Sequence, residues 1–422
     1  MKNVSIIKIH TLLFCLYMSA ANNASAQSNE KSSSWKSTIK THASIAIDTN
    51  VYIQDAGPNA EESSLVWKAG LDFKTAYTSE NAKVALSFAP TLIEYADTDD
   101  QSHQTYIFSA SGKAGTPDSG LIKGKANFHV IDGNELGPSF PGTGATFLGG
   151  VGRRNRHDAY IAKLSLAYTR AFSETLHGTV RYNGYFHDFQ TRSFESSDPN
   201  KPTGYVNYSD RSNQTLGLEV GWQALGEASV RAAYEFGWQD QDEKLGSSLE
   251  YDNTYHRLLI GVSGKVNETF SADFLVGPEF RSFDGTSATG FDEDRTLLYA
   301  AGSVSAKLGK KGKLTAIVSR YAQPSYTGGS VYEDYKWTFK YAQAFDDGLD
   351  TTLAFVRYEG DWLSGQGISR NDILYSGIAT LQKGFANGLK VKGLVQYDTS
   401  ESVVAIQEYD RTYAEVSVHK TW

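Results

Sequence analysis

The chain ends in Asp410–Trp422, which reads D-R-T-Y-A-E-V-S-V-H-K-T-W. In an extended segment Ala414, Val416 and Val418 share one face, with Lys420 as the polar exception. The other face carries Tyr413, Glu415, Ser417, His419 and Thr421. A period of two with one apolar face is typical of a strand between two different solvents. A final tryptophan is unusual in a soluble domain, where chain ends fray into water, but it fits a barrel strand that ends in a membrane interface.

This ending resembles the assembly signal that closes bacterial outer-membrane β-barrels, which implies that Trp422 is recognised by the barrel-assembly machinery. The fragments I-D-T-N-V-Y (47–52) and Y-D-R-T-Y-A-E-V (409–416) are similar to the ends of β-barrel porin families. Many members of those families belong to exopolysaccharide systems. The second fragment also resembles the barrel of surface-lipoprotein assembly modifiers, although this chain lacks the helical periplasmic repeats that precede the barrel there.

The first 26 residues predict a secretory signal peptide. Lys2 and Lys8 precede a short apolar run, and Ala24-Ser25-Ala26 forms a cleavage site before Gln27. A membrane-spanning helix would need about 20 apolar residues, and this run is shorter. The sole cysteine, Cys15, lies inside the signal, so disulfides and cysteine nucleophiles are excluded for the mature chain. Residues 27–36 then form a polar tail that we expect in the periplasm.

Residues 37–422 keep one pattern and predict a single domain. Apolar and polar side chains alternate in segment after segment, as in Ile39–Asp48, and no convincing amphipathic helix interrupts them. We therefore predict an all-β fold, a transmembrane antiparallel up-and-down β-barrel of about 18 strands of roughly ten residues each. Sixteen strands is the alternative, because weak segments such as Gln104–Gly112 are easily misread.

The connections between these segments alternate between short and long. Short ones lie at 78–82, 172–175, 225–228, 266–269, 309–312, 345–348 and 385–388. Long ones lie near 51–63, 131–158, 188–212, 239–252, 283–294 and 359–370. Outer-membrane barrels have short periplasmic turns and long external loops, whereas a soluble β-sandwich has no reason to sort its loops in this way. The pattern predicts a multi-pass barrel in the outer membrane of a Gram-negative bacterium.

A barrel of this size encloses an aqueous lumen, so its inward side chains set selectivity. The alternation predicts these pore-lining residues: Lys40, Lys68, Asp72, Lys74, Lys123, Lys125, Arg181, Arg231, Lys336 and Lys340. Basic residues modestly outnumber acidic ones on the inner face, whereas acidic clusters such as Glu61-Glu62 and Asp292–Asp294 occupy the external loops. One interpretation is an anion pathway with an acidic vestibule, whose carboxylates could also bind divalent cations. The other is that charges of both signs simply pair across strands.

The third external connection, Ile131–Asp158, is rich in glycine and ends in R-R-N-R-H. Resemblance to general porins implies that this loop tucks into the lumen and narrows it. The residues that would form the constriction are Asp132, Glu135, Arg153, Arg154 and Arg156. The alternative is a flexible outer loop.

The sequence predicts a porin for passive diffusion of small polar or anionic solutes, including oligosaccharides. The alternative is a barrel that exports an anionic polysaccharide, or a surface-presenting or assembly barrel without an open pore. No catalytic or metal-binding motif stands out, so we expect neither an enzyme nor a cofactor. Expected partners are outer-membrane lipid and lipopolysaccharide, the barrel-assembly machinery and small polar solutes, with no nucleic acid. The oligomeric state is left open.

Overall fold

The computed structural model describes residues 34–53, 61–98, 101–133, 159–189, 210–241, 252–283, 294–324, 331–363, 370–402 and 408–422. The predicted signal peptide, residues 1–26, and most of the predicted tail lie outside these ranges. No helix within them is long and apolar enough to cross a membrane.

The described residues form 18 strands in one sheet. The strands are β1 (Ser34–Asp48), β2 (Ser64–Thr78), β3 (Ala82–Tyr95), β4 (His103–Ala114), β5 (Leu121–Gly133), β6 (Ala159–Ala171), β7 (Leu176–Phe189), β8 (Arg211–Leu225), β9 (Glu227–Gln241), β10 (Asn253–Lys265), β11 (Phe270–Phe283), β12 (Asp294–Leu308), β13 (Gly312–Pro324), β14 (Val331–Ala344), β15 (Leu349–Leu363), β16 (Arg370–Gly384), β17 (Leu389–Ser402) and β18 (Tyr409–Thr421).

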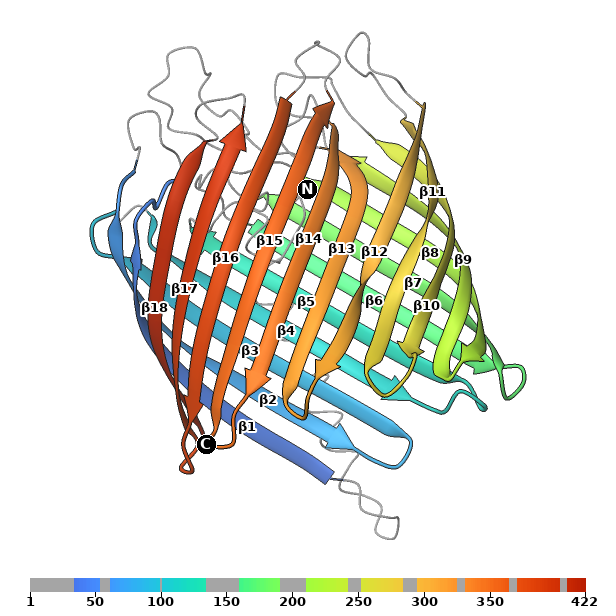
Figure 1. The fold of residues 1–422 in the computed structure, drawn as a ribbon, viewed down its shortest axis with the longest axis horizontal. Coiled ribbons are helices and arrows are strands. Elements are labelled where there is room, and N and C mark those ends of the chain that lie inside the picture. The colour runs from blue at the N-terminus through green and yellow to red at the C-terminus, as the bar shows by residue number, and fades with distance from the viewer. Residues whose placement is uncertain are drawn as a thin grey trace, which may run out of the picture.

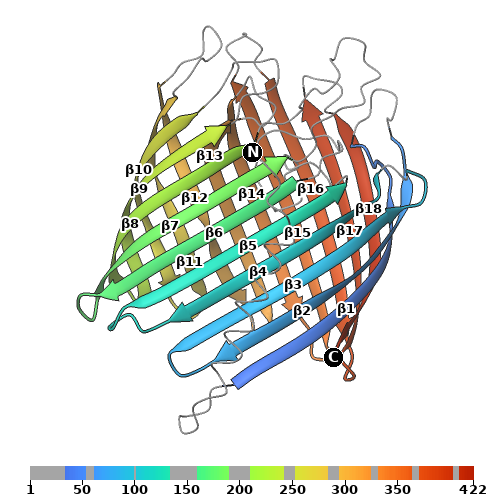
Figure 2. The same ribbon diagram turned by 180° about the vertical axis from the view of Figure 1, so that it is seen from behind.

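Each strand pairs antiparallel with its neighbours in the chain, and β18 closes the sheet against β1 (Figures 1 and 2). At this seam Ser44 lies opposite Ser417, and Ile45 lies opposite Val416. The predicted all-β antiparallel barrel is therefore confirmed, with 18 strands rather than 16. The weak segment Gln104–Gly112 is a strand after all, within β4.

The strands are longer than the predicted ten residues, ranging from 12 in β4 to 15 in β1. A tilted strand needs more residues to cross the same thickness, and these strands also extend beyond the apolar belt. The barrel begins at Ser34 rather than at residue 37, because Ser34 to Ser37 pair with Thr75 to Thr78 of β2. The ring of Trp35 lies 5.3 Å from that of Tyr77, so the end of the predicted tail belongs to the wall.

The two ends of the barrel differ as the sequence predicts. The end that carries the C-terminus also carries the tight turns that join β2 to β3, β14 to β15 and β16 to β17 (Figure 1). We call this the short-turn end and the opposite one the long-loop end. In bacterial barrels the short turns face the periplasm.

The outer surface is apolar and ends in aromatic side chains. Ile47 and Ile260 of the wall are 56% and 66% exposed, which is costly in water and favourable in lipid. Exposed aromatic residues near the short-turn end are Trp35, Phe172, Trp222, Phe270, Phe345, Phe385 and Trp422. Those near the long-loop end are Trp67, Phe186, Phe280 and Tyr397. A closed barrel leaves no unpaired sheet edge, so it can span a bilayer, and these two girdles mark its interfaces. The chain is an outer-membrane β-barrel, as predicted.

Candidate functional site

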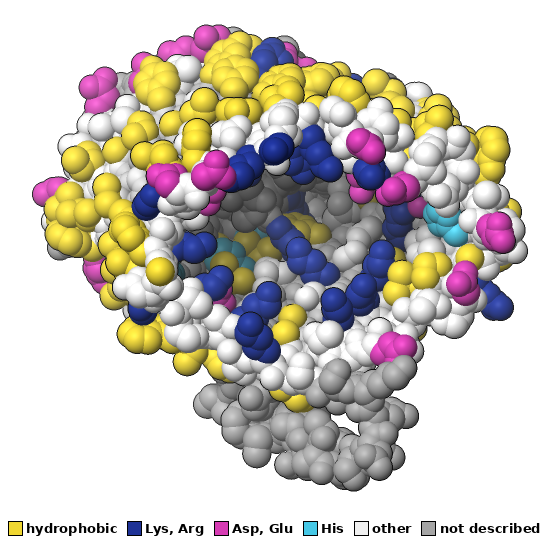
Figure 3. All heavy atoms as spheres, turned by 60° about the horizontal axis from the view of Figure 1, so that its bottom comes forward, with side chains coloured by type: hydrophobic (Ala, Val, Ile, Leu, Met, Phe, Trp, Pro, Cys, Tyr) yellow, Lys and Arg dark blue, Asp and Glu magenta, His cyan; other side chains and the backbone are white. Residues whose placement is uncertain are grey.

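The lumen is the candidate site, because the inner face of the wall carries the charges. Along β5, the exposed apolar Ile122 alternates with Lys123 and Lys125, and along β7 Val180 alternates with Arg181. Viewed from the short-turn end, the opening is hollow, with lysine and arginine side chains around its inner rim and hydrophobic ones outside (Figure 3). The inner face of the wall therefore contacts water, and the outer face contacts lipid.

The strand register places all ten predicted pore-lining residues on the inner face. Lys40 lies opposite Asp72, beside the outward pair of Ile39 and Phe73. The others alternate with outward neighbours in the same way: Lys68, Lys74, Lys123, Lys125, Arg181, Arg231, Lys336 and Lys340. Eight of the ten fall into two groups by environment: three are paired with carboxylates of the described residues, and five lysines are not.

The arginines belong to an ion-pair network on the wall from β7 to β11. Arg231 is buried, and its guanidinium lies 3.4 Å from Glu219 and 2.7 Å from Asp273. Arg181 pairs with the same Glu219 at 2.5 Å. Arg231 also donates to the carbonyl oxygens of Val262 and Phe274, both at 3.2 Å. Because each guanidinium is matched by carboxylates, this wall adds little net charge to the lumen.

A second network lies nearer the long-loop end. Arg257 bonds Glu279 at 2.6 Å and Glu235 at 3.1 Å, and Arg281 bonds Glu279 at 2.9 Å. Arg281 also donates to Gln239 at 2.7 Å and Asn253 at 2.5 Å. Both guanidinium groups pack against the ring of Tyr255. The alternation put these charges on the inner face, but nothing in the sequence indicated which of them would pair.

Lys68 also belongs to a compensated cluster, at the seam. Its ammonium group lies 2.9 Å from Glu415 and 2.5 Å from the hydroxyl of Tyr413. Beside it Arg411 makes two bonds of 2.8 Å to Asp48 and lies 3.5 Å from Asp398. Lys68 is thus an inward lysine whose charge is already neutralised, and Arg411 is a buried charge that sequence reasoning did not single out.

Eleven further inward lysines lie toward the short-turn end. Five of them were predicted to line the pore, and six others share their environment. They are Lys40, Lys74, Lys83, Lys113, Lys123, Lys125, Lys307, Lys313, Lys340, Lys390 and Lys392. No ion pair within 4.0 Å joins any of them to a carboxylate among the described residues. We call this set the lysine ring; it leaves the short-turn mouth with net positive charge.

A cavity of about 920 Å³ connects opposite walls of the lumen. Lys123 of β5 and Lys336 of β14 both line it, although these strands lie half-way round the barrel from each other. Arg181, Arg231 and Glu219 line the same space. Charges from separate strands therefore face a single aqueous compartment.

One residue of the predicted constriction loop, Asp132, lies in a strand instead of a loop. Asp132 is the penultimate residue of β5, opposite Gln104 on the outer face and next to the inward Ile131, because the strand pairing continues to Gly133. The assignment of Asp132 to an inward loop was wrong. Glu135, Arg153, Arg154 and Arg156 lie outside the described residues. The described residues do contain an inward-folded loop, but it is the start of the first connection, where Val51 and Ile53 are buried.

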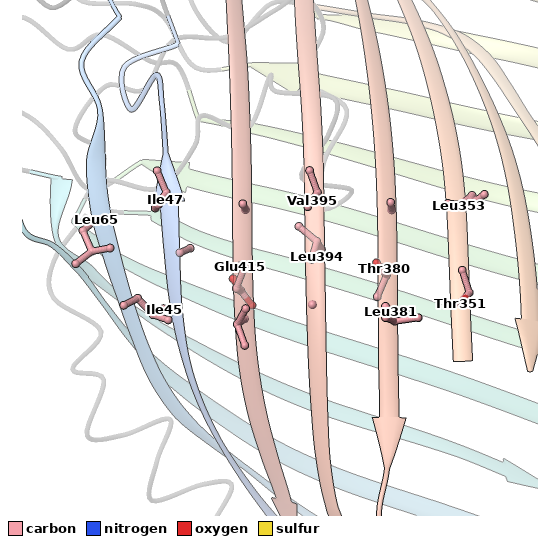
Figure 4. Close-up of a pocket in the computed structure, with 15 residues that line it drawn as sticks. Ile45, Ile47, Leu65, Thr351, Leu353, Thr380, Leu381, Leu394, Val395 and Glu415 are labelled. Atoms are coloured by element: carbon pink, nitrogen blue, oxygen red, sulfur yellow. The ribbon is translucent and has the colours of Figure 1, made fainter. Parts of the chain in front are cut away.

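A second hollow lies on the lipid side and is not part of the site. This groove of about 550 Å³ crosses strands β15 to β18, β1 and β2 on the outer face (Figure 4). Ile45, Leu353 and Leu381 border it, and small residues such as Gly393 and Ala414 form part of its lining. Its lining is almost wholly apolar, which suits acyl chains rather than a polar solute.

The acidic clusters predicted for the external loops fall only partly within the described ranges. Glu61, Glu62, Asp97, Asp240 and Asp294 are described, whereas their neighbours Asp99, Asp100, Asp242, Glu243, Asp292 and Glu293 are not. Across the described segments, no group of three or more His, Cys, Asp or Glu residues is arranged to hold a metal ion.

No family model and no curated protein matches the chain. Among solved structures, it is similar to the outer-membrane protein OpdK of Pseudomonas aeruginosa, with 11% identity and a TM-score of 0.43 over 92% of this chain and 99% of that one. It is also similar to OccAB3 of Acinetobacter baumannii, with 13% identity and a TM-score of 0.43 over 92% and 99%. It is similar as well to a mutant of the ferric enterobactin receptor PfeA of Pseudomonas aeruginosa, with 9% identity and a TM-score of 0.41 over 90% of this chain and 80% of that one. These similarities are too distant to indicate a solute, and the closed sheet itself establishes the fold.

Proposed function

We propose that the protein is a water-filled channel for passive diffusion of small polar solutes, with a preference for anions. The observation that carries this proposal is the lysine ring, whose eleven ammonium groups lie on β1 to β5, β12 to β14 and β17 near the short-turn end and form no ion pair with a described carboxylate. Barrels of this strand number are wide enough to hold an aqueous channel, and the cavity shared by Lys123 and Lys336 fits such an interior.

The sign of the selectivity follows from which charges are paired. Arg181, Arg231, Arg257 and Arg281 face the lumen, and each is bonded to a carboxylate. The lysine ring has no such partners in the described part of the chain. At physiological ionic strength a charge is screened over about 8 Å, so ammonium groups on the wall of a confined lumen attract anions and repel cations. Charge pairing and anion selectivity, which the sequence presented as alternatives, are therefore assigned to different parts of the lumen.

The proposal is tested by reconstituting the purified barrel in planar bilayers. We expect a steady ohmic conductance without added energy or ligand, and in a KCl gradient a reversal potential displaced toward that of chloride. Swelling of proteoliposomes should be faster with small anionic sugars than with cationic solutes of the same size. A barrel that carries no current would favour the presenting or assembly barrel, and a cation-selective current would remove the role given to the lysine ring.

A further inference from the structure

The first connection turns inward as soon as it leaves β1. The backbone amide of Thr49 donates to the carbonyl oxygen of Thr412 at 3.0 Å, and the Thr412 amide returns a 2.8 Å bond to the Thr49 hydroxyl. The Asn50 side-chain amide donates to the carbonyl oxygen of Asp410 at 3.0 Å. These bonds hold residues 49–53, which we call the inner segment, against the start of β18.

Two apolar contacts then place the inner segment across the inside of the wall. Val51 has no exposed surface and packs with Ala46, Val66 and Tyr95 from β1, β2 and β3. Ile53, 1% exposed, packs with Tyr358, Leu374 and Tyr409 from β15, β16 and β18. All six partners are inward side chains. Within six residues of Asp48, the last residue of β1, the chain therefore crosses the seam and contacts the inner face of β18, β16 and β15.

The backbone of the inner segment is held in a conformation that its sequence disfavours. Ile53 has a φ of 51°, a left-handed conformation that β-branched residues rarely adopt. Such a conformation persists only where the surroundings determine it. The amide of Val51 also donates to the carbonyl oxygen of Glu62 at 2.7 Å, which ties the two described ends of this connection together. The contacts of Ile53 therefore outweigh its local preference.

An exposed apolar patch inside a wet lumen is unfavourable, because apolar surface in contact with water costs free energy. Tyr358, Leu374 and Tyr409 would form such a patch, and each is at most 1% exposed because the patch is covered. The inner wall thus provides a docking surface that matches Ile53, and the covering segment occupies part of the lumen at the long-loop end.

We infer that the inner segment is a fixed constriction of the channel and that Ile53 is the residue that holds it in place. This inference rests on the proposed channel function. It assigns the narrowing to the first connection, and makes the inner segment a determinant of solute size, whereas the lysine ring at the other end determines charge.

The test combines conductance with thiol labelling. Ile53→Asp places a charge in the apolar cluster and should release the inner segment, so the single-channel conductance should rise roughly twofold as the narrowest section widens. Ile53→Leu keeps an apolar anchor of equal volume and is the matched control, with conductance close to that of the parent. Labelling uses Leu374→Cys, since the only native cysteine is Cys15 in the predicted signal peptide. A charged, membrane-impermeant thiol reagent should modify this site slowly in the parent background and at least tenfold faster together with Ile53→Asp.

Two results would overturn the inference. If the Leu374→Cys site stays unreactive in the Ile53→Asp background, Ile53 does not hold the segment. If labelling accelerates but the conductance is unchanged, the segment is released without having narrowed the pore. A reconstituted parent barrel that carries no current would instead count against the proposed channel, while the labelling result would still decide whether Ile53 is the anchor.

Discussion

The guanidinium of Arg411 on the last strand makes two 2.8 Å bonds to the carboxylate of Asp48 on the first strand. Both side chains are buried, and Asp398 of β17 lies 3.5 Å from the same guanidinium. A bidentate pair of this kind fixes the relative orientation of the two side chains as well as the distance between them. It lies where β18 must meet β1, next to the start of the inner segment, and so joins closure of the barrel to the inward path of the first connection.

Replacing Arg411 should weaken this closure. Arg411→Ala leaves Asp48 buried without its partner, and breaking a buried ion pair in this way costs about 3–5 kcal/mol. The temperature at which the folded barrel changes its mobility in a detergent gel should fall clearly. Adding Asp48→Asn to this variant removes one uncompensated charge and should restore part of the loss. An Arg411→Ala barrel as heat-resistant as the parent would show that the pair does not hold the seam.

A close approach between Gly237 and Tyr255 gives a second prediction. They lie opposite each other on β9 and β10, and a Cβ atom added to Gly237 would lie 2.0 Å from the Tyr255 ring. Tyr255 also bonds Thr215 at 2.7 Å and packs under Arg257. Gly237→Ala should therefore destabilise the barrel by about 1–3 kcal/mol, measured by urea unfolding in lipid.

The control for that substitution is Gly393→Ala, because no atom lies within 4 Å of a Cβ added there. It should leave the unfolding midpoint unchanged or slightly raised, since alanine restricts the unfolded chain more than glycine does. Equal effects of the two substitutions would mean that the steric contact with Tyr255 is not what matters.

Trp422 is expected to act in assembly rather than in the finished barrel. Its side chain is 72% exposed. Its backbone amide donates to the carbonyl oxygen of Ile39 at 2.9 Å, and this hydrogen bond does not depend on the side chain. Trp422→Ser should reduce the amount of assembled barrel in the outer membrane while the remaining barrel unfolds like the parent. Trp222→Ser, which changes another exposed tryptophan near the same end, is the matched control. Unchanged assembly of the Trp422 variant would mean that the barrel-assembly machinery does not recognise Trp422 as a signal.

The faces of the strands could be predicted from sequence because a period of two is a local property. Once Ile122 faces lipid, Lys123 must face the lumen, whatever the rest of the chain does. The strand number followed in the same way, since β4 keeps the alternation even though Ala110 and Gly112 make its outer face weakly apolar. Loop lengths then indicated which end holds the turns.

The partners of the inward charges could not be predicted, because they depend on contacts between distant segments. Arg231 reaches Asp273 on β11, two strands away, and Lys68 reaches Glu415 across β1. The inward path of the first connection was missed for a related reason. Val51 and Ile53 look like ordinary loop residues until Tyr358 and Leu374, some 300 residues later, form the surface that receives Ile53.

The orientation of the barrel can be tested independently of its pore. An epitope tag near Gly246, in the connection between β9 and β10, should be accessible to antibody on intact cells. A tag near Lys311, in the turn between β12 and β13, should become accessible only after the outer membrane is permeabilised. The opposite labelling would place the lysine ring at the cell surface.

The most direct test of the central claim is the reversal potential of a channel in which Lys123→Glu, Lys125→Glu and Lys340→Glu are combined. Lys68 is left unchanged, because Glu415 already compensates its charge. The control combines Lys311→Glu and Lys383→Glu, which reverse charges in or beside the short turns, where they pair with Asp346 and Asp347. In a KCl gradient the triple variant should shift from anion toward cation preference, whereas the control should match the parent. The shift should shrink in 1 M salt, where screening acts over about 3 Å. A triple variant that folds, conducts and keeps the parent's reversal potential would contradict the account.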